Sequence, residues 1–303
     1  MSTVQGRHGL TWHGQGRAEL QYGPISMRIF ARKAGQPYAP GVVAASDAAR
    51  ESLDSLAPFR AFAGTMAGRL RAEAALLHGP GSLPPVLRLM MEAAFATGED
   101  LVTPLIAVAG SIAQMAMEAA LAAGADTAVV ENGGDVALTV APGETVRLGV
   151  ARSIDDRSLR RTAFLSSEHS IGGVCTSGLG GRSFTLGVAD AAVAFGPAAA
   201  AADACATLLA NATFVSDPAV ERHLAEHLDP DTDIPGFLVV TAVGTMSPSS
   251  VALALEQAER CALSFVRSGL VTGALIAVQG REIVVPREFE AVFTPVHPAD
   301  PLA

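Results

Sequence analysis

The chain has 303 residues, of which 50% are hydrophobic and 17% are charged, and its formal net charge is -9. This length and apolar content predict an extensive buried core, and the acidic charge argues against a general nucleic-acid or anionic-membrane surface. An anionic ligand would therefore be met locally, by backbone amides, a metal ion or a few arginines.

The first third of the chain predicts a β-hairpin followed by helices. Two short alternating runs, Ala18–Tyr22 and Ile25–Ala31, flank a Gly-Pro turn. After them the composition becomes helical. A capping serine, a loop at Gly79–Pro85 and a final glycine indicate where the helices begin and end. The expected helices are Ala44–Leu56 with its N-cap near Ser46, Pro85–Ala96, and Pro104–Ala123 with Gly124 as C-cap.

Beyond Gly124 the hydrophobic period shortens to that of strands. Expected strands are Thr127–Glu131, Val136–Ala141, Val146–Ala151, Arg161–Leu165, Gly173–Thr176, Ser183–Leu186, Ala191–Phe195 and Phe237–Ala242. Helices are expected at Pro197–Asn211 and Ser249–Arg267, followed by a hairpin of Leu270–Val278 with Glu282–Val285. Because tight turns join several of these strands, the fold class is α+β, with mixed or antiparallel sheets packed with helices. Residues 1–303 form one domain, with two lobes at about 1–124 and 125–303 as the alternative.

The cysteines and the apolar segments bear on the compartment. Cys175, Cys205 and Cys261 are far apart and form no CxxC pair, so they are expected to be small packing residues in a reducing compartment. The first residues lack the apolar segment of a signal peptide. Three polar residues interrupt the apolar run Pro104–Ala123, which favours a buried helix over a membrane span. A cytoplasmic location is expected.

Asp203 and Thr207 lie four residues apart in an alanine-rich run of helical composition. That spacing places a carboxylate and a hydroxyl on one helix face, one turn apart. Hard cations take such oxygen ligands, and a nucleotide phosphate often completes their coordination. The alternative is a solvated helix face, but an isolated acid among apolar residues needs a partner. The pair therefore favours a metal-dependent phosphate or nucleotide site.

Two glycine-rich turns extend this hypothesis. The run Glu131-Asn132-Gly133-Gly134-Asp135 lies between two expected strands. It is either a plain hairpin turn or a turn whose glycines let a ligand approach the backbone. The run from Gly172 to Ser183 contains Thr176, Ser177, Gly178 and Arg182. Consecutive amides and hydroxyls there could cradle a pyrophosphate, or the run could be a flexible loop between strands.

The histidines give weaker evidence for a binding site. His223 and His227 stand four apart with Glu226 between them, which could hold a metal on a helix. No third ligand is evident and the surroundings are charged, so a solvated helix face is the preferred interpretation. His169 precedes the glycine-rich run and could approach a ligand.

Taken in order, these motifs resemble the ApbE-like superfamily, which includes the FAD:protein FMN transferases, and within it the uncharacterised UPF0280 family. The resemblance rests on four segments at similar separations: Val102–Gly110, Glu131–Asp135, Gly173–Gly178 and Ala202–Thr207. It implies that magnesium is held by Asp203, Thr207 and the main-chain carbonyl of Val108. It also implies that the pyrophosphate of FAD lies near Thr176, Ser177 and Gly178, and its adenosine near Asn132, Gly133, Gly134 and Asp135.

One departure from the superfamily pattern divides the functional hypotheses. The transferases carry a His-x-x-x-Asp-Pro-x-Thr/Ser-Gly loop soon after the Thr-Ser-Gly element, whereas the span 181–190 here has neither histidine nor Asp-Pro. The first hypothesis is a magnesium-dependent flavin or nucleotide pyrophosphate enzyme, either an FMN transferase or an FAD pyrophosphatase. The second is a non-catalytic flavin- or nucleotide-binding protein, and the third a scaffold without a small ligand. Expected partners are a nucleotide or flavin, an acceptor protein and a second copy of the chain, with no nucleic acid and no membrane.

Overall fold

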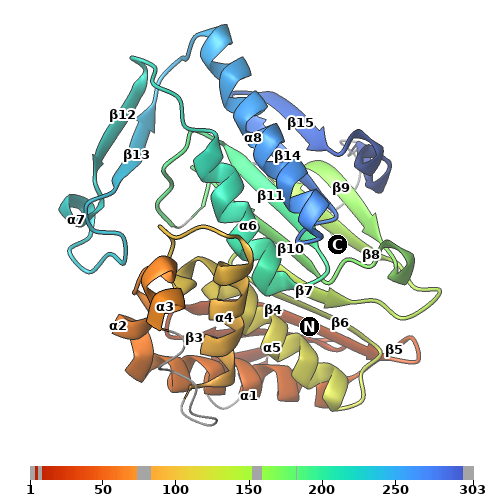
Figure 1. Ribbon diagram of the computed structural model, residues 1–303. Helices are drawn as coiled ribbons and strands as arrows, with labels where there is room; N and C mark the ends of the chain where they lie inside the picture. Colours follow the sequence, from red (N-terminus) through yellow and green to blue (C-terminus); the bar gives the residue numbers. More distant parts are fainter. Residues whose placement is uncertain (1–3, 6–8, 74–82, 152–158, 182, 296–303) are drawn as a thin grey trace.

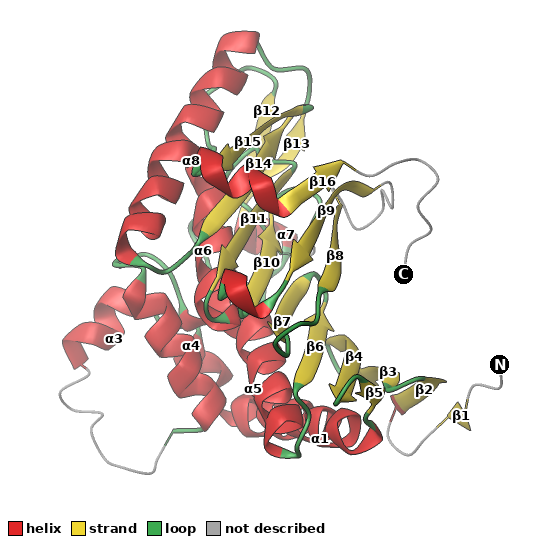
Figure 2. Cartoon of the chain, turned by 90° about the vertical axis from the view of Figure 1, so that its right-hand side faces the viewer, coloured by secondary structure: helices red, strands yellow, loops and turns green. Residues whose placement is uncertain are grey.

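The computed structural model describes residues 4–5, 9–73, 83–151, 159–181 and 183–295. One long antiparallel sheet runs through the molecule, with helices on one face and a second, smaller sheet over part of the other (Figures 1 and 2). The strand order of the long sheet is β1-β2-β3-β4-β6-β7-β10-β11-β14-β15, with β5 paired to β4. The predicted α+β class, with antiparallel sheets packed with helices, is confirmed.

The long sheet begins with the predicted hairpin, whose second strand alternates buried and solvent-facing residues as an amphipathic strand does. Its strands are β1 (Val4–Gln5), β2 (Leu10–Gly14), β3 (Arg17–Tyr22), β4 (Ile25–Lys33), β5 (Gln36–Pro37), β6 (Thr127–Asn132), β7 (Asp135–Thr139), β10 (Gly173–Ser177), β11 (Ala191–Gly196), β14 (Gly273–Val278) and β15 (Arg281–Val285). The second sheet contains β8 (Val146–Ala151), β9 (Leu159–Leu165) and β16 (Phe293–Pro295). A separate two-stranded ribbon pairs β12 (Val220–Leu224) with β13 (Leu238–Val243).

Helices cover one face of the long sheet (Figure 2). The α-helices are α1 (Ala39–Leu56), α2 (Arg60–Ala63), α3 (Ala67–Glu73), α4 (Pro85–Ala96), α5 (Val108–Ala122), α6 (Ala199–Ala212), α7 (Ala225–Leu228) and α8 (Pro248–Ser268). Short 3-10 turns are η2 (Ala57–Phe59), η4 (Pro104–Ala107), η5 (Ser167–His169) and η6 (Arg287–Val292). Prolines stand in the first turns of α1, α4 and α8, where their missing N–H costs no helical hydrogen bond.

Three sequence expectations differ from the structure. Helix α1 begins at Ala39, not Ala44, because Pro40 starts it, and Ser46 lies inside the helix with its hydroxyl donating to the Val43 carbonyl. The expected strand Ser183–Leu186 is not a strand. The segment Val220–Leu224, interpreted as part of a helix face through its histidine spacing, is strand β12, paired with β13. Of the expected loop Gly79–Pro85, residues 79–82 lie outside the described residues.

Two hydrophobic cores flank the long sheet. The larger lies between the sheet and the helices, and the smaller lies between the sheet and the β8-β9-β16 sheet. Strands β11 and β14 are buried at every position, since both of their faces are covered. In the smaller core the rings of Phe195, Phe289 and Phe293 pack with centroids 5.1–5.9 Å apart.

The proposed lobe boundary at residue 124 falls between β4 and β6, which are hydrogen-bonded neighbours. The division into two lobes stays a prediction. Gly124 has a positive φ of 104°, as expected of a residue that ends a helix. The segment Pro104–Ala122 is long and apolar enough to cross a membrane by length and composition, but it lies among α1, α6 and the sheet as a core helix.

Candidate functional site

Four elements converge on the helix-facing side of the long sheet. They are the turn between β6 and β7, the end of β10, the first turns of α6 and the start of α5. Helix α6 lies very close to β10, because Gly173 has no side chain to hold it off: a Cβ there would come within 2.3 Å of the Cα of Ala199. This close approach brings Asp203 of α6 over the sheet, next to α5.

The Asp203 carboxylate bridges α6 and α5. Its Oδ2 accepts a hydrogen bond of 2.8 Å from the backbone N–H of Gly110, in the first turn of α5. The first N–H groups of a helix have no partner within the helix and carry its positive dipole end, so they suit a carboxylate. Gly110 is required at this point, since a Cβ there would lie 2.5 Å from the Ala199 carbonyl oxygen and 2.7 Å from the Cβ of Asp203.

A second carboxylate, Asp135, lies buried at the start of β7. Its Oδ1 accepts from the backbone N–H of Thr176 at 3.2 Å, and the Cys175 thiol, which donates to the Ala199 carbonyl at 3.3 Å, lies near this carboxyl. Burial raises the pKa of Asp135 to about 7, and the hydrogen bonds only partly offset that effect. Burial, together with the negative charge of Asp135, raises the pKa of Asp203 well above its usual range.

Neither carboxylate forms an ion pair with any residue in the described ranges. Burying two negatively charged carboxylates near each other, with no basic side chain beside them, costs free energy. That cost is reduced when a carboxylate is protonated or when the pair binds a cation. The arrangement therefore suits a cation-binding or proton-holding function. The Cys175 thiol is not a nucleophile here, because burial and the two carboxylates raise its pKa well above the ordinary value.

The predicted nucleotide turn has the geometry of a β-hairpin. Gly133 and Gly134 have φ values of 67° and 113°, and Asn132 pairs with Asp135 across the turn. Asn132 is buried, and its Nδ2 donates to the Ala109 carbonyl at 3.3 Å, while the Gly134 N–H donates to Glu131. Asp135 is only 8% exposed, so its carboxylate is largely withdrawn from solvent.

The predicted pyrophosphate element lies at the end of β10. Strand alternation directs the Ser177 side chain to the helix-facing side, as for Cys175, whereas Thr176 faces the other side and is exposed. Gly178 has a φ of 129°, and a Cβ there would lie 2.8 Å from the Ala189 carbonyl oxygen. The backbone of Leu179 and Gly180 returns to Ala189 and Asp190 by hydrogen bonds, so the glycine-rich run folds into a tight turn. Arg182 lies outside the described residues.

The two other predicted metal ligands flank Asp203. Thr207 is half-buried one turn along α6, and its hydroxyl forms no hydrogen bond with the residues that the structure describes. Val108 is half-buried and is the first residue of α5. Its carbonyl points along the helix, so a metal would use the lone pair not engaged by the helix. Across the described residues, no group of three or more His, Cys, Asp or Glu side chains could hold a metal ion.

The histidines take no part in this region. The Nδ1 of His169 lies 3.0 Å from both the N–H and the hydroxyl of Ser166, which makes a capping box for η5. His223 lies on β12 and His227 on α7, so the two do not share a helix face. Gly110 was absent from the predicted set, although its place in Val-Ala-Gly at the end of a motif was a usable signal.

Comparison with protein families gives one extensive match. A family model described as AbpE bacteria matches residues 10–284. Among curated proteins, a UPF0280 protein of Methanosarcina acetivorans is 40% identical over 144 residues, covering 47% of this chain and 54% of that protein. A UPF0280 protein of Methanopyrus kandleri is 38% identical over 162 residues, covering 53% of this chain and 61% of that protein. The alignments thus span little more than half the length of these relatives.

Among solved structures, flavin transferase ApbE from Vibrio cholerae aligns over 90% of this chain and 98% of its own, with 12% identity and a TM-score of 0.46. The apo form of flavinyl transferase ApbE from Pseudomonas stutzeri aligns over 88% of this chain and 93% of its own, with 14% identity and a TM-score of 0.45.

Proposed function

Because this chain belongs to the family described as AbpE bacteria, we propose that it is a magnesium-dependent enzyme acting on the pyrophosphate of a flavin nucleotide. It either transfers FMN from FAD to a Ser or Thr hydroxyl of an acceptor protein, or hydrolyses FAD to FMN and AMP. The observation that carries the proposal is the pair of buried carboxylates, Asp135 and Asp203, without a basic partner.

The donor set fits a hard divalent cation. Asp203 presents a carboxylate at the start of α5, Thr207 adds a free hydroxyl one turn away, and the Val108 carbonyl lies on the neighbouring helix. These three oxygens are fewer than the six that Mg²⁺ requires, and water and substrate phosphates commonly supply the others. When bound, Mg²⁺ would neutralise charge on the phosphate oxygens in the transition state.

The residues of the chain hold this arrangement in place. The Gly110 N–H fixes one oxygen of Asp203 and leaves the other for the metal. Asp135 accepts a hydrogen bond from the Thr176 N–H and so positions the end of β10. Ser177 and Gly178 at that end would meet the pyrophosphate. The attacking hydroxyl or water oxygen forms a bond to the phosphorus of the FMN half. The bond from that phosphorus to the bridging oxygen breaks, AMP leaves with the bridging oxygen, and the nucleophile's proton passes to solvent.

A titration with FAD, with and without Mg²⁺, tests the proposal. Adenine quenches the flavin fluorescence of FAD, so cleavage raises the signal, and chromatography of the released AMP confirms the products. The expected result is a slow, Mg²⁺-dependent rise that Asp203→Asn abolishes while Glu131→Gln leaves it intact. Turnover that is unchanged in Asp203→Asn would disprove the metal assignment.

A second candidate is a flavin- or nucleotide-binding protein without catalysis. It is favoured by the span 181–190, which lacks the histidine and Asp-Pro of the transferase loop and contains no strand among its described residues. Saturable FAD binding with no AMP release, with or without an acceptor peptide, would support this candidate over the enzyme.

A further inference from the structure

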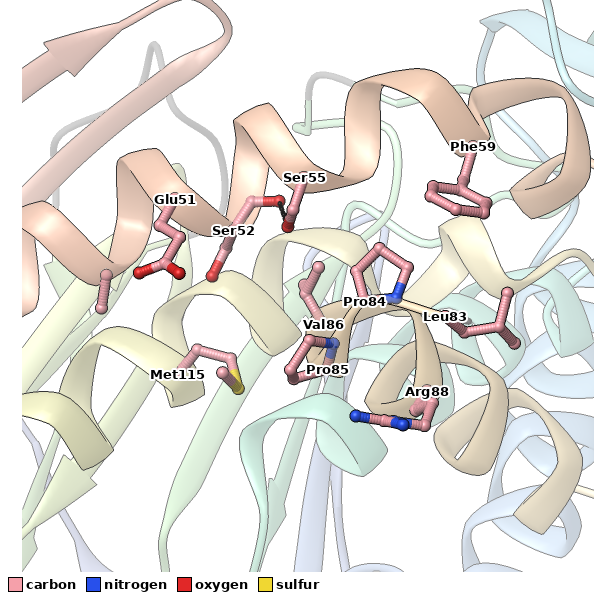
Figure 3. Close-up of a pocket in the computed structure, with 11 residues that line it drawn as sticks. Glu51, Ser52, Ser55, Phe59, Leu83, Pro84, Pro85, Val86, Arg88 and Met115 are labelled. Carbon is pink, nitrogen blue, oxygen red and sulfur yellow. Dashed lines mark hydrogen bonds between the residues drawn. The ribbon is translucent and has the colours of Figure 1, made fainter. Parts of the chain in front are cut away.

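A groove lies between α1 and the start of α4, away from the residues discussed so far. It encloses about 500 Å³, a volume suited to a small molecule. One wall comes from α1 and η2, the other from the residues that begin α4, and Met115 of α5 lies at its base (Figure 3). We call it the α1–α4 groove; its lining is Ala48, Glu51, Ser52, Ser55, Phe59, Leu83, Pro84, Pro85, Val86, Arg88 and Met115.

Ser52 is the feature that distinguishes this groove from a gap in packing. The residue is only 4% exposed, and its hydroxyl forms no hydrogen bond with the residues that the structure describes. Figure 3 shows the side chain pointing from α1 into the space above Val86 and Met115. The neighbouring Ser55 is already satisfied, since its hydroxyl donates to the Ser52 carbonyl at 3.1 Å. The Ser52 hydroxyl therefore lines the groove with its hydrogen-bonding capacity free, and a ligand atom in the groove could bond to it.

The charges of the groove are opposite and separated. Glu51 stands on α1 and Arg88 in the first turns of α4, and neither forms an ion pair within the described parts of the chain. The N-terminal end of α4 adds a positive dipole on the side of Arg88. Between the charges the lining is apolar, with Phe59, Leu83 and Val86.

We propose that the α1–α4 groove binds a small zwitterionic molecule with an apolar body, of the class of a short apolar peptide with free ends. Its ammonium group meets Glu51, its carboxylate meets Arg88 and the start of α4, and its backbone hydrogen-bonds to Ser52. Glu51 and Arg88 are both exposed, and a ligand with one charge would meet only one of these two side chains. The groove shares no residue with the candidate flavin site, so this proposal stands independently of the proposed function.

Trileucine serves as the probe, with its N-acetylated and C-amidated forms as single-charge controls. Binding to the full chain is followed by calorimetry and by the NMR signal of the ¹³C-labelled Met115 methyl group, assigned with Met115→Leu. Saturable binding of trileucine is expected, weakened about tenfold by either blocking group. No saturable change at Met115, or equal binding of the three peptides, would overturn the proposal.

Substitutions test the two ends separately. Glu51→Gln should weaken trileucine about tenfold but leave the acetylated peptide unaffected, and Arg88→Gln should do the same for the amidated peptide. Glu259→Gln and Arg267→Gln, exposed residues on α8, are matched controls that should bind normally. If the Glu51 and Arg88 variants also bind normally, the charges play no part and the proposal fails.

Ser52→Ala gives a readout on the empty protein. Because the hydroxyl has no partner, its removal should leave the melting temperature unchanged or raise it, while weakening trileucine binding severalfold. A lowered melting temperature would mean that the hydroxyl is satisfied within the chain, which would contradict the observation on which the proposal depends.

Discussion

The two ends of the long sheet differ in what covers them. From β2 to β4 the helices cover one face and the other is open, so Phe30 lies on the surface between the guanidinium groups of Arg17 and Arg32. From β7 to β14 the second sheet covers that other face as well, and Phe195 is completely buried. The candidate site lies at the border, on the helix-facing side.

The two carboxylates on either side of the β6–β7 turn differ in the same way, one on the open face and one on the covered face. Glu131 lies on the open face, where it pairs with Arg28 at 2.7 Å with its side chain 23% exposed. Asp135, four residues later, lies on the helix-facing side, buried and without a basic partner. Strand alternation thus gives one acid a solvated ion pair of small energetic value and the other a strongly perturbed environment. The carboxylate with the raised pKa is therefore the one on the covered side.

The largest expected effect is on catalysis. Asp203→Asn keeps an oxygen for the Gly110 N–H but removes the charge that would bind Mg²⁺, so FAD turnover should fall by about 100-fold or more. Glu131→Gln, on the open face, should change turnover less than about twofold. Steady-state assays at saturating Mg²⁺ provide the comparison. Equal losses in both variants would break the distinction between the two faces.

The next largest effect is on stability. Phe195→Ala removes a ring packed against Phe289 and Phe293, and should lower the free energy of unfolding by about 3–5 kcal/mol. Phe30→Ala, on the open face, loses two cation–π contacts and should cost only about 1 kcal/mol. Urea denaturation measures both, and a similar cost for the two rings would show that the open face is covered in solution.

The pH dependence of stability comes third. In metal-free protein the pKa of Asp135 is raised to about 7, so between about pH 4 and 7 the folded state holds a proton that the unfolded state has lost. The free energy of unfolding should therefore fall as pH rises through this window, by up to about 4 kcal/mol from this group. Asp135→Asn should remove the part of the slope that this group contributes, leaving that of Asp203, while Glu131→Gln should leave the profile unchanged. A profile that rises from pH 4 to 7 would contradict the assignment.

The smallest expected effect concerns helix spacing. Gly110→Ala would place a Cβ 2.5 Å from the Ala199 carbonyl oxygen, so α5 and α6 must separate, at a cost of about 1–3 kcal/mol. Gly244→Ala is the matched control, because its nearest neighbours are 3.6 Å away. If thermal melting shows no difference between the two variants, the helices can adjust and the close approach is not required.

Most of the helices and strands were predictable from local sequence patterns. The alternation in Ala18–Tyr22, the prolines before α4 and the alanine-rich run of α6 each specify an element within a few residues. Strand β12 escaped prediction because its stability depends on pairing with β13, and the spacing of His223 and His227 imitated a helix. Long-range pairing of a polar strand leaves little local signal.

Sequence patterns selected the residues of the candidate site but did not indicate the contacts between them. The isolated acid at Asp203 indicated a buried, partnered carboxylate, yet its partner is an amide 93 positions earlier, which only packing reveals. Asp135 accepts a hydrogen bond from the Thr176 N–H, a contact that the sequence did not indicate. The ligand roles of all the proposed site residues remain predictions: Asp203, Thr207, Val108, Asn132, Gly133, Gly134, Asp135, Thr176, Ser177 and Gly178.

The close packing of α6 against the sheet limits which positions of the protein can change during evolution. Where Gly173, Ala199 and Gly110 meet, almost any larger side chain would collide with backbone atoms, so inherited variation there would be eliminated by selection. Strand β12 of the β12–β13 ribbon (Figure 1) pairs only with β13 among the described residues, whereas β13 also donates from the Val240 N–H to the Thr185 carbonyl, so the exposed positions of β12 are freer to drift. Sequence change in descendants of this chain should therefore collect at such exposed positions, while the interior around Asp203 is inherited almost unchanged.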